Sequence, residues 1–171
     1  MKIAAVAVAL AALLSVPASA LAQNAPAPAP KPCAAPEYRQ FDFWIGQWDV
    51  FNPAGKLVGH SRIEPFAGGC ALLENWSSLN PGGDGKSINI YDATDKRWHQ
   101  SWADASGSRL LIEGGLANGS MVMSAGTGTV QRITWTPLAG GAVRQHWEIS
   151  QDGGRTWTTS FDGKYVKHES Q

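Results

Sequence analysis

Short runs of alternating apolar and polar residues recur from Gln47 to Tyr165, separated by turns rich in glycine, proline, asparagine and aspartate. Alternation with a period of two is the pattern of a half-buried strand. Runs that start roughly 8–12 residues apart are typical of an antiparallel barrel or sandwich. The pattern predicts about ten strands, at Gln47–Phe51, Leu57–Phe66, Leu72–Leu79, Ser87–Tyr91, Trp98–Asp104, Arg109–Glu113, Ser120–Ser124, Val130–Pro137, Ala142–Ser150 and Thr156–Tyr165.

The connections between these runs are short, which favours a meander in which each strand pairs with the next one along the chain. Closing such a meander into a barrel removes the exposed strand edges. We therefore predict an all-β fold, a single antiparallel meander β-barrel of about ten strands. A two-sheet sandwich is the alternative.

The stretch Glu37–Phe51 places five aromatic side chains between Phe41 and Phe51. Each aromatic side chain removes about 150–250 Å² from water when it is buried, so this stretch belongs to the core. We expect a short helical plug at Pro36–Trp44, ahead of the first strand. Gly46 then allows the chain to bend where helix and strand cross.

The N-terminal segment has the features of a signal peptide. A lysine at position 2, an apolar stretch over Ile3–Leu14 and the small-x-small sequence Ala20-Leu21-Ala22 predict cleavage after residue 22. The apolar stretch is shorter than the ~20 residues of a membrane span, so we expect export to the periplasm or secretion without a membrane span. An Ala/Pro-rich linker at 23–36 and a barrel domain at 37–168 would follow.

The 14 basic and 14 acidic residues give a formal net charge of zero, and no basic run occurs. Nucleic-acid binding depends on neutralising phosphates, so this charge pattern argues against a nucleic-acid partner. The pattern makes no prediction of oligomeric state. The two cysteines, Cys33 and Cys70, lie in a chain with an export signal, where pairing is favoured. We predict a disulfide between them, with two unpaired thiols as the alternative.

Strand alternation sorts side chains onto two faces. In three of the predicted strands, tryptophan and glutamine share the apolar face, which we interpret as the inner one. Glu74 and Trp76 share a face in the same way, whereas Ile88 and Ile90 compete with their neighbours for the interior. The predicted ligand-binding residues are Glu74, Trp76, Asn89, Tyr91, Trp98, Gln100, Trp102, Gln131, Gln145 and Trp147.

Indole rings supply rigid apolar contact, and amides orient a ligand without requiring charge. We therefore predict a binding protein for a small, neutral, partly apolar molecule. One alternative is an enzyme, an isomerase or hydrolase, in which Glu74 is a desolvated general acid. The other is a structural envelope protein with a filled barrel. No other catalytic motif is present.

The histidines, at positions 60, 99, 146 and 168, show no metal-ligand spacing, so we predict no metal site and no other cofactor. His146 falls on the outer face, and for that reason we do not expect heme. Ser150–Trp157 matches the Asp-box pattern S-x-D-x-G-x-T-W, which we interpret as a structural hairpin.

The sequence Phe-Asp-Phe-Trp-Ile-Gly-x-Trp-Asp-Val at Phe41–Val50 resembles the opening of a family of exported bacterial proteins without assigned function. Glu74-x-Trp76 and Trp98-x-Gln100-x-Trp102 resemble later stretches of that family. The resemblance to that family implies no catalytic residues, because none are known for the family. Gly46-x-Trp48 also resembles the start of the calycin barrels, which include the lipocalins, the fatty-acid-binding proteins and heme-binding relatives. That resemblance implies a basic residue from the last strand beneath the tryptophan, which would be Lys164.

Overall fold

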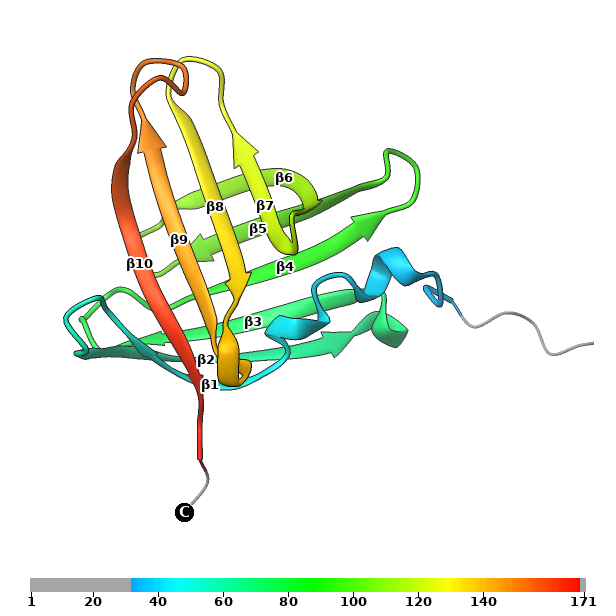
Figure 1. Cartoon of the computed structure of the whole chain (residues 1–171), viewed down its shortest axis with the longest axis horizontal. Helices are drawn as coiled ribbons and strands as arrows, with labels where there is room; N and C mark the ends of the chain where they lie inside the picture. Colours follow the sequence, from blue (N-terminus) through cyan, green and yellow to red (C-terminus); the bar gives the residue numbers. More distant parts are fainter. Residues whose placement is uncertain (1–31, 170–171) are drawn as a thin grey trace, which may run out of the picture.

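Ten antiparallel strands form a closed barrel in the computed structural model, which describes residues 32–169 (Figure 1). Each strand pairs with its sequence neighbour, and the first pairs with the last. The predicted meander barrel is confirmed, and the sandwich alternative is wrong. The predicted signal peptide and residues 23–31 of the predicted linker lie outside the described residues.

The strand bounds follow the alternating pattern closely. They are β1 Gly46–Phe51, β2 Leu57–Phe66, β3 Ala71–Ser78, β4 Gly85–Asp92, β5 Arg97–Asp104, β6 Arg109–Ala117, β7 Ser120–Ala125, β8 Val130–Pro137, β9 Val143–Ser150 and β10 Thr158–Lys167. Strand β6 is longer than predicted because Gly114 continues it. A Cβ atom at Gly114 would lie 2.0 Å from the carbonyl oxygen of Val122 in β7, so glycine permits the close pairing.

Two short 3₁₀ turns, η1 Pro36–Arg39 and η2 Asp42–Trp44, form the plug in place of one continuous helix. Phe41 and Trp44 are fully buried and stack with ring centroids 4.9 Å apart. Phe41 also meets Trp98 of β5 and Trp135 of β8 edge-on, at 5.6 and 5.2 Å. The plug therefore fills the barrel end at which β1 begins. Two further 3₁₀ turns are η3 Ala67–Gly69 and η4 Ala139–Gly141.

The predicted disulfide between Cys33 and Cys70 is present, with the Cα atoms 5.1 Å apart. Cys70 lies between η3 and β3, and Cys33 precedes the plug. The bond spans 37 positions of the chain, for which loop entropy suggests a stabilisation of roughly 4 kcal/mol. Arg39 also donates a hydrogen bond to the carbonyl oxygen of Gly69. The plug is thus tied to the start of β3 twice.

The predicted Asp-box hairpin is present between β9 and β10. Asp152 accepts hydrogen bonds from the backbone N–H groups of Arg155 and Thr156, at 3.0 and 2.8 Å, and from the Thr156 hydroxyl at 2.7 Å. These bonds lower the pKa of Asp152 to about 2, and the bond from the backbone N–H of Thr156 has the largest effect. Because Thr156 belongs to this turn, β10 begins at Thr158, two residues later than predicted.

The basic residue over Trp48 is Lys167, and the expectation of Lys164 is wrong. The Lys167 Nζ lies 3.8 Å from the centroid of the Trp48 ring and donates a 2.7 Å hydrogen bond to the carbonyl oxygen of Ile45. Lys164 pairs in register with Phe51, whereas Lys167 pairs with Trp48. Lys167 is two residues after the buried Tyr165 and shares its parity, but Lys164 is on the outer face.

Over residues 32–169, every helical segment is too short to cross a membrane as an apolar helix.

Gly46 has a φ of 146°, a conformation that residues with a Cβ atom rarely adopt, and an added Cβ would lie 2.3 Å from the Lys167 Nζ. We predict that Gly46→Ala lowers the free energy of unfolding by about 1–3 kcal/mol. Urea denaturation followed by fluorescence measures this change. Gly115→Ala in β6 is the control, because a Cβ atom there meets nothing within 4 Å; equal effects of the two substitutions would contradict the prediction.

Candidate functional site

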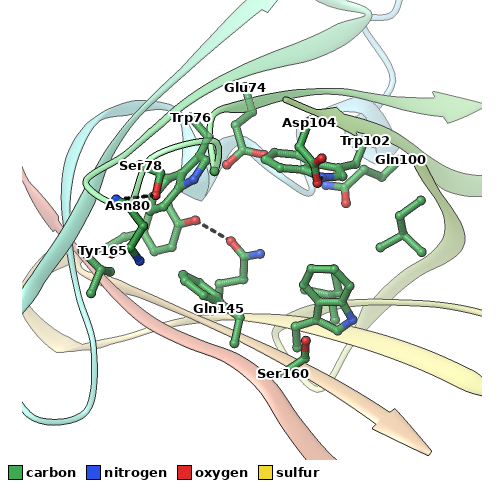
Figure 2. A pocket seen from close by; sticks show the side chains of 16 residues that line it. Glu74, Trp76, Ser78, Asn80, Gln100, Trp102, Asp104, Gln145, Ser160 and Tyr165 are labelled. Carbon is green, nitrogen blue, oxygen red and sulfur yellow. Dashed lines mark hydrogen bonds between the residues drawn. The ribbon is translucent and has the colours of Figure 1, made fainter. Parts of the chain in front are cut away.

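A cavity of about 280 Å³ lies inside the barrel (Figure 2). It is at the end opposite the plug, because Trp98 at the start of β5 packs against Phe41, whereas Trp102 and Asp104 at the end of β5 line the cavity. Its mouth is formed by the end of β3, the turn after β3, the end of β5 and the start of β10, where the lining residues Asn80 and Ser160 are exposed. The lining residues are Val58, Glu74, Trp76, Ser78, Asn80, Gly83, Gln100, Trp102, Asp104, Leu110, Ile133, Gln145, Trp147, Ser160, Phe161 and Tyr165.

Six of the ten predicted ligand-binding residues line this cavity, namely Glu74, Trp76, Gln100, Trp102, Gln145 and Trp147. The other four lie elsewhere. Asn89 is fully buried behind Gln100 and bonded to it, and Gln131 accepts a 3.1 Å hydrogen bond from the Trp147 indole without lining the cavity. Tyr91 and Trp98 belong to the plug end, where Tyr91 packs against Tyr38 and Trp98 against Phe41.

Several cavity residues were missed by the sequence analysis. Tyr165 and Phe161 both point inward from β10, and the same alternation that indicated the tryptophan strands could have found them. Asp104 shares the parity of Trp102, two residues earlier. The turn residues Asn80 and Gly83 carry no periodic signal, because their position depends on how the β3–β4 turn folds over the mouth.

Alternation did not decide which side chains of β4 point into the barrel, and polar contacts decide it. Ser87 and Asn89 are 1% and 0% exposed, whereas Ile88 and Ile90 are 46% and 40% exposed. The polar face of the strand is therefore inside and its isoleucines are outside. This inversion is explained by Glu74 on the neighbouring strand β3, which pairs in register with Ser87.

Glu74 is 4% exposed and accepts hydrogen bonds from two serine hydroxyls. Ser61 Oγ donates to Glu74 Oε1 at 3.1 Å, and Ser87 Oγ donates to Glu74 Oε2 at 2.8 Å. The Asn89 side-chain amide donates to Ser87 Oγ at 2.9 Å, and the Gln100 amide donates to Asn89 Oδ1 at 2.8 Å. A continuous chain of bonds thus runs from Gln100 at the cavity wall to the carboxyl of Glu74.

Burial raises the pKa of the Glu74 carboxyl to about 7, although the hydrogen bonds from Ser87 and Ser61 act in the opposite direction. Tyr165 is also buried, and burial together with the Glu74 carboxylate raises the pKa of its phenol well above the usual value. The Tyr165 hydroxyl donates a 2.5 Å hydrogen bond to Gln145 Oε1, drawn as the dashed line between the two in Figure 2. Near neutral pH the cavity therefore contains a carboxyl group able to hold or release a proton.

Three indoles and one phenyl ring supply the apolar walls. Trp76 and Phe161 meet edge-on with centroids 6.0 Å apart. The indole N–H of Trp102 donates to Asp104 Oδ2 at 3.2 Å, and that of Trp147 donates to Gln131. Because these bonds fix both ring planes, the apolar surface is already oriented before any ligand enters.

The charge of the lining is acidic. Glu74 and Asp104 contribute carboxyl groups, while the sixteen lining residues include no lysine, arginine or histidine. Hydrogen bonds from Ser106 and Trp102 lower the pKa of Asp104, so this carboxylate is ionised near neutral pH. The arrangement can accept hydrogen bonds from a ligand, and it disfavours a ligand that carries negative charge.

The histidines lie outside this cavity. His99 and His146 are on the outer face, with His99 Nε2 2.8 Å from Asp95 Oδ2 and His146 Nε2 3.0 Å from Thr159 Oγ1. An imidazole ligand for a heme iron is thus absent from the cavity lining.

No protein-family model and no curated protein matches this sequence.

Glu74→Gln tests the state of the buried carboxyl. The pKa of about 7 in the folded protein exceeds the ordinary value of 4.5 that applies to the unfolded chain, so the folded state binds the proton more tightly. Stability from this group is fully present below pH 4.5 and is lost as the pH rises through 7.

We predict that the free energy of unfolding of the native protein falls, relative to that of Glu74→Gln, by about 3 kcal/mol between pH 4.5 and pH 8. Urea titrations of both proteins across this range measure the difference. Parallel pH profiles of the two proteins would contradict a raised pKa at Glu74.

Proposed function

We propose that this chain is an exported binding protein that holds a small, neutral, partly apolar molecule in the barrel cavity. The observation that carries this proposal is the pairing of oriented indole walls with converging amide, hydroxyl and carboxyl groups in one cavity. Ligand sites in proteins typically combine apolar walls with a few fixed polar groups in this manner.

The size of the cavity supports a small ligand. Its volume of about 280 Å³ lies near the lower limit of the ~300–1,000 Å³ usual for ligand sites. The three tryptophans would contact the rings or chains of the ligand, and Gln100 and Gln145 would fix its orientation. Export is supported by the disulfide, since disulfides persist in oxidising compartments.

The lining charge supports a neutral ligand over an anionic one. The ionised Asp104 at the mouth repels negative charge, and no basic side chain in the lining offers compensation. A carboxylate or phosphate would lose its hydration on entry without gaining a partner. A neutral molecule with hydroxyl or amide N–H groups would instead donate to Gln145, Asp104 or Glu74.

An enzyme is the second candidate, favoured by the pKa of about 7 at Glu74. A carboxyl with this pKa can exchange a proton with a bound substrate at neutral pH, as an isomerase or hydrolase requires. The proton could pass between Glu74 and the substrate, with Tyr165 as a hydrogen-bond partner of the bound molecule. If the protein is an enzyme, Glu74→Gln abolishes turnover of the natural molecule but leaves its binding intact.

Native mass spectrometry of the protein purified from its own host tests the binding function directly. We expect a co-purifying small molecule that is released on denaturation. Repeated recovery of the protein without a small molecule, combined with failure to bind 2-naphthol or 2-naphthoate, would favour a structural protein instead.

Two probe molecules of similar shape test whether the cavity prefers a neutral ligand to an anionic one. We predict that 2-naphthol binds at least about tenfold more tightly than 2-naphthoate. The naphthoate has a carboxylate in place of the hydroxyl group, and the acidic lining repels that negative charge. Isothermal titration calorimetry at pH 7.5 measures both affinities. Tighter binding of the naphthoate would contradict the proposed selectivity.

The indole walls are tested by substitution. We predict that Trp102→Ala weakens 2-naphthol binding by about tenfold or more, as expected for removal of an aromatic anchor. His146→Ala on the outer face is the control and should leave the affinity unchanged. Loss of binding in the control, with Trp102→Ala unaffected, would place the site outside the barrel.

A further inference from the structure

A second group of polar side chains gathers on the outer wall, where the first and last strands close the barrel. Asp49 points outward from β1, because its neighbours Trp48 and Val50 are both buried. His60 is the direct cross-strand partner of Asp49 in β2. His168 follows the end of β10, on the other side of β1.

The two imidazoles approach the same carboxylate. His60 Nδ1 lies 2.7 Å from Asp49 Oδ1, and His168 Nδ1 lies 3.0 Å from Oδ1 and 3.1 Å from Oδ2. The three potential ligand atoms, one from each residue, all lie within 4.8 Å of one another. Three segments of the chain thus bring two nitrogen donors and one oxygen donor close enough together to contact one ion.

The cluster is both held in place and open to solvent. The backbone N–H of His168 donates a 2.9 Å hydrogen bond to the carbonyl oxygen of Gln47, which fixes the chain just beyond β10. The side chains of His60, Asp49 and His168 are 48%, 26% and 45% exposed. A groove of about 330 Å³ bordered by both histidines lies beside them, so an ion has access to the donors.

Two imidazole nitrogens and a carboxylate oxygen are a donor set for Zn²⁺, Cu²⁺ or Ni²⁺. Mg²⁺ and Ca²⁺ prefer oxygen donors alone. Metal–ligand bonds of about 2.0–2.2 Å place tetrahedral ligand atoms roughly 3.3 Å apart. The observed N–O separations of 2.7–3.1 Å would need to widen by only a few tenths of an ångström.

We propose that Asp49, His60 and His168 form a binding site for a divalent transition metal, with Zn²⁺ as its representative ion. Three protein ligands leave a coordination position for water or for a small ligand in the groove. A metal bound here links β2, β1 and the chain after β10, so it stabilises the folded barrel by binding the native state. The site is separate from the cavity, and its existence does not depend on the proposed function.

The chain offers two matched controls. Asp92, Asp95 and His99 form the other cluster of this type among the described residues, but it contains one imidazole and two carboxylates. His146 contacts Thr159 and lies in neither cluster. His99→Ala and His146→Ala therefore remove one histidine each without touching the proposed site.

The experiment uses the protein without a histidine tag, after treatment with a chelator. Calorimetric titration with ZnCl₂ should give one Zn²⁺ per chain, and Zn²⁺ should raise the melting temperature. We expect His60→Ala and His168→Ala each to weaken Zn²⁺ binding more than about tenfold and to remove the melting shift. Both residues are exposed, so the variants should fold, which circular dichroism checks.

Electron paramagnetic resonance of the Cu²⁺-loaded protein gives a readout independent of affinity. Coupling to two imidazole nitrogens is expected in the native protein and in both controls, and coupling to one in His60→Ala. Absence of stoichiometric Zn²⁺ binding would overturn the proposal. So would Zn²⁺ binding that survives in the His60→Ala/His168→Ala double variant, or that is lost in His99→Ala or His146→Ala.

Discussion

Pairing of β1 with β10 closes the sheet, and every other feature of the interior depends on that closure. A closed sheet gives each of the ten strands one face toward a common core. Trp48 lies in β1, in the strand pair that closes the barrel. Its indole N–H donates a 2.9 Å hydrogen bond to the carbonyl oxygen of Trp44, and the Lys167 ammonium lies over its ring. Trp48 and Lys167 therefore connect the closing strand pair to the end of the plug.

The plug fills one end of the barrel with apolar side chains, and the polar side chains of the interior lie toward the other end. Phe41, Trp44 and Trp135 occupy the plug end with no exposed surface. Beyond them, the interior contains Glu74 and the amides bonded around it. A buried carboxyl is tolerated there because Ser61 and Ser87 satisfy its oxygens, while burial keeps it protonated more readily than in water. The barrel interior thus changes along its axis from an apolar core to a cavity that combines apolar walls with polar groups.

Much of the fold could be predicted from sequence because strand alternation is a local property of consecutive residues. Strands β2 and β8 begin and end where the pattern predicted, and parity alone placed Gln100, Gln145 and Trp147 in the interior. Parity was not enough for β4, since both of its faces could be buried. There the need of the buried Glu74 carboxyl on β3 for a hydrogen-bond donor decided the outcome, because Ser87 donates to it from the inner face of β4, and the pattern of β4 alone does not contain that information.

The number of strands, their sequential pairing and the inward face of most of them could be predicted, because alternation and short connections are local features of the chain. Which inward residues share one cavity depends on the folded barrel, in which Asn89, Tyr91, Trp98 and Gln131 lie outside the cavity lining. Folding also brings His168 to Asp49, which is 119 positions away in the chain. Contacts across the barrel and along its closing strand pair depend on the register between distant strands, which alternation within one strand does not specify.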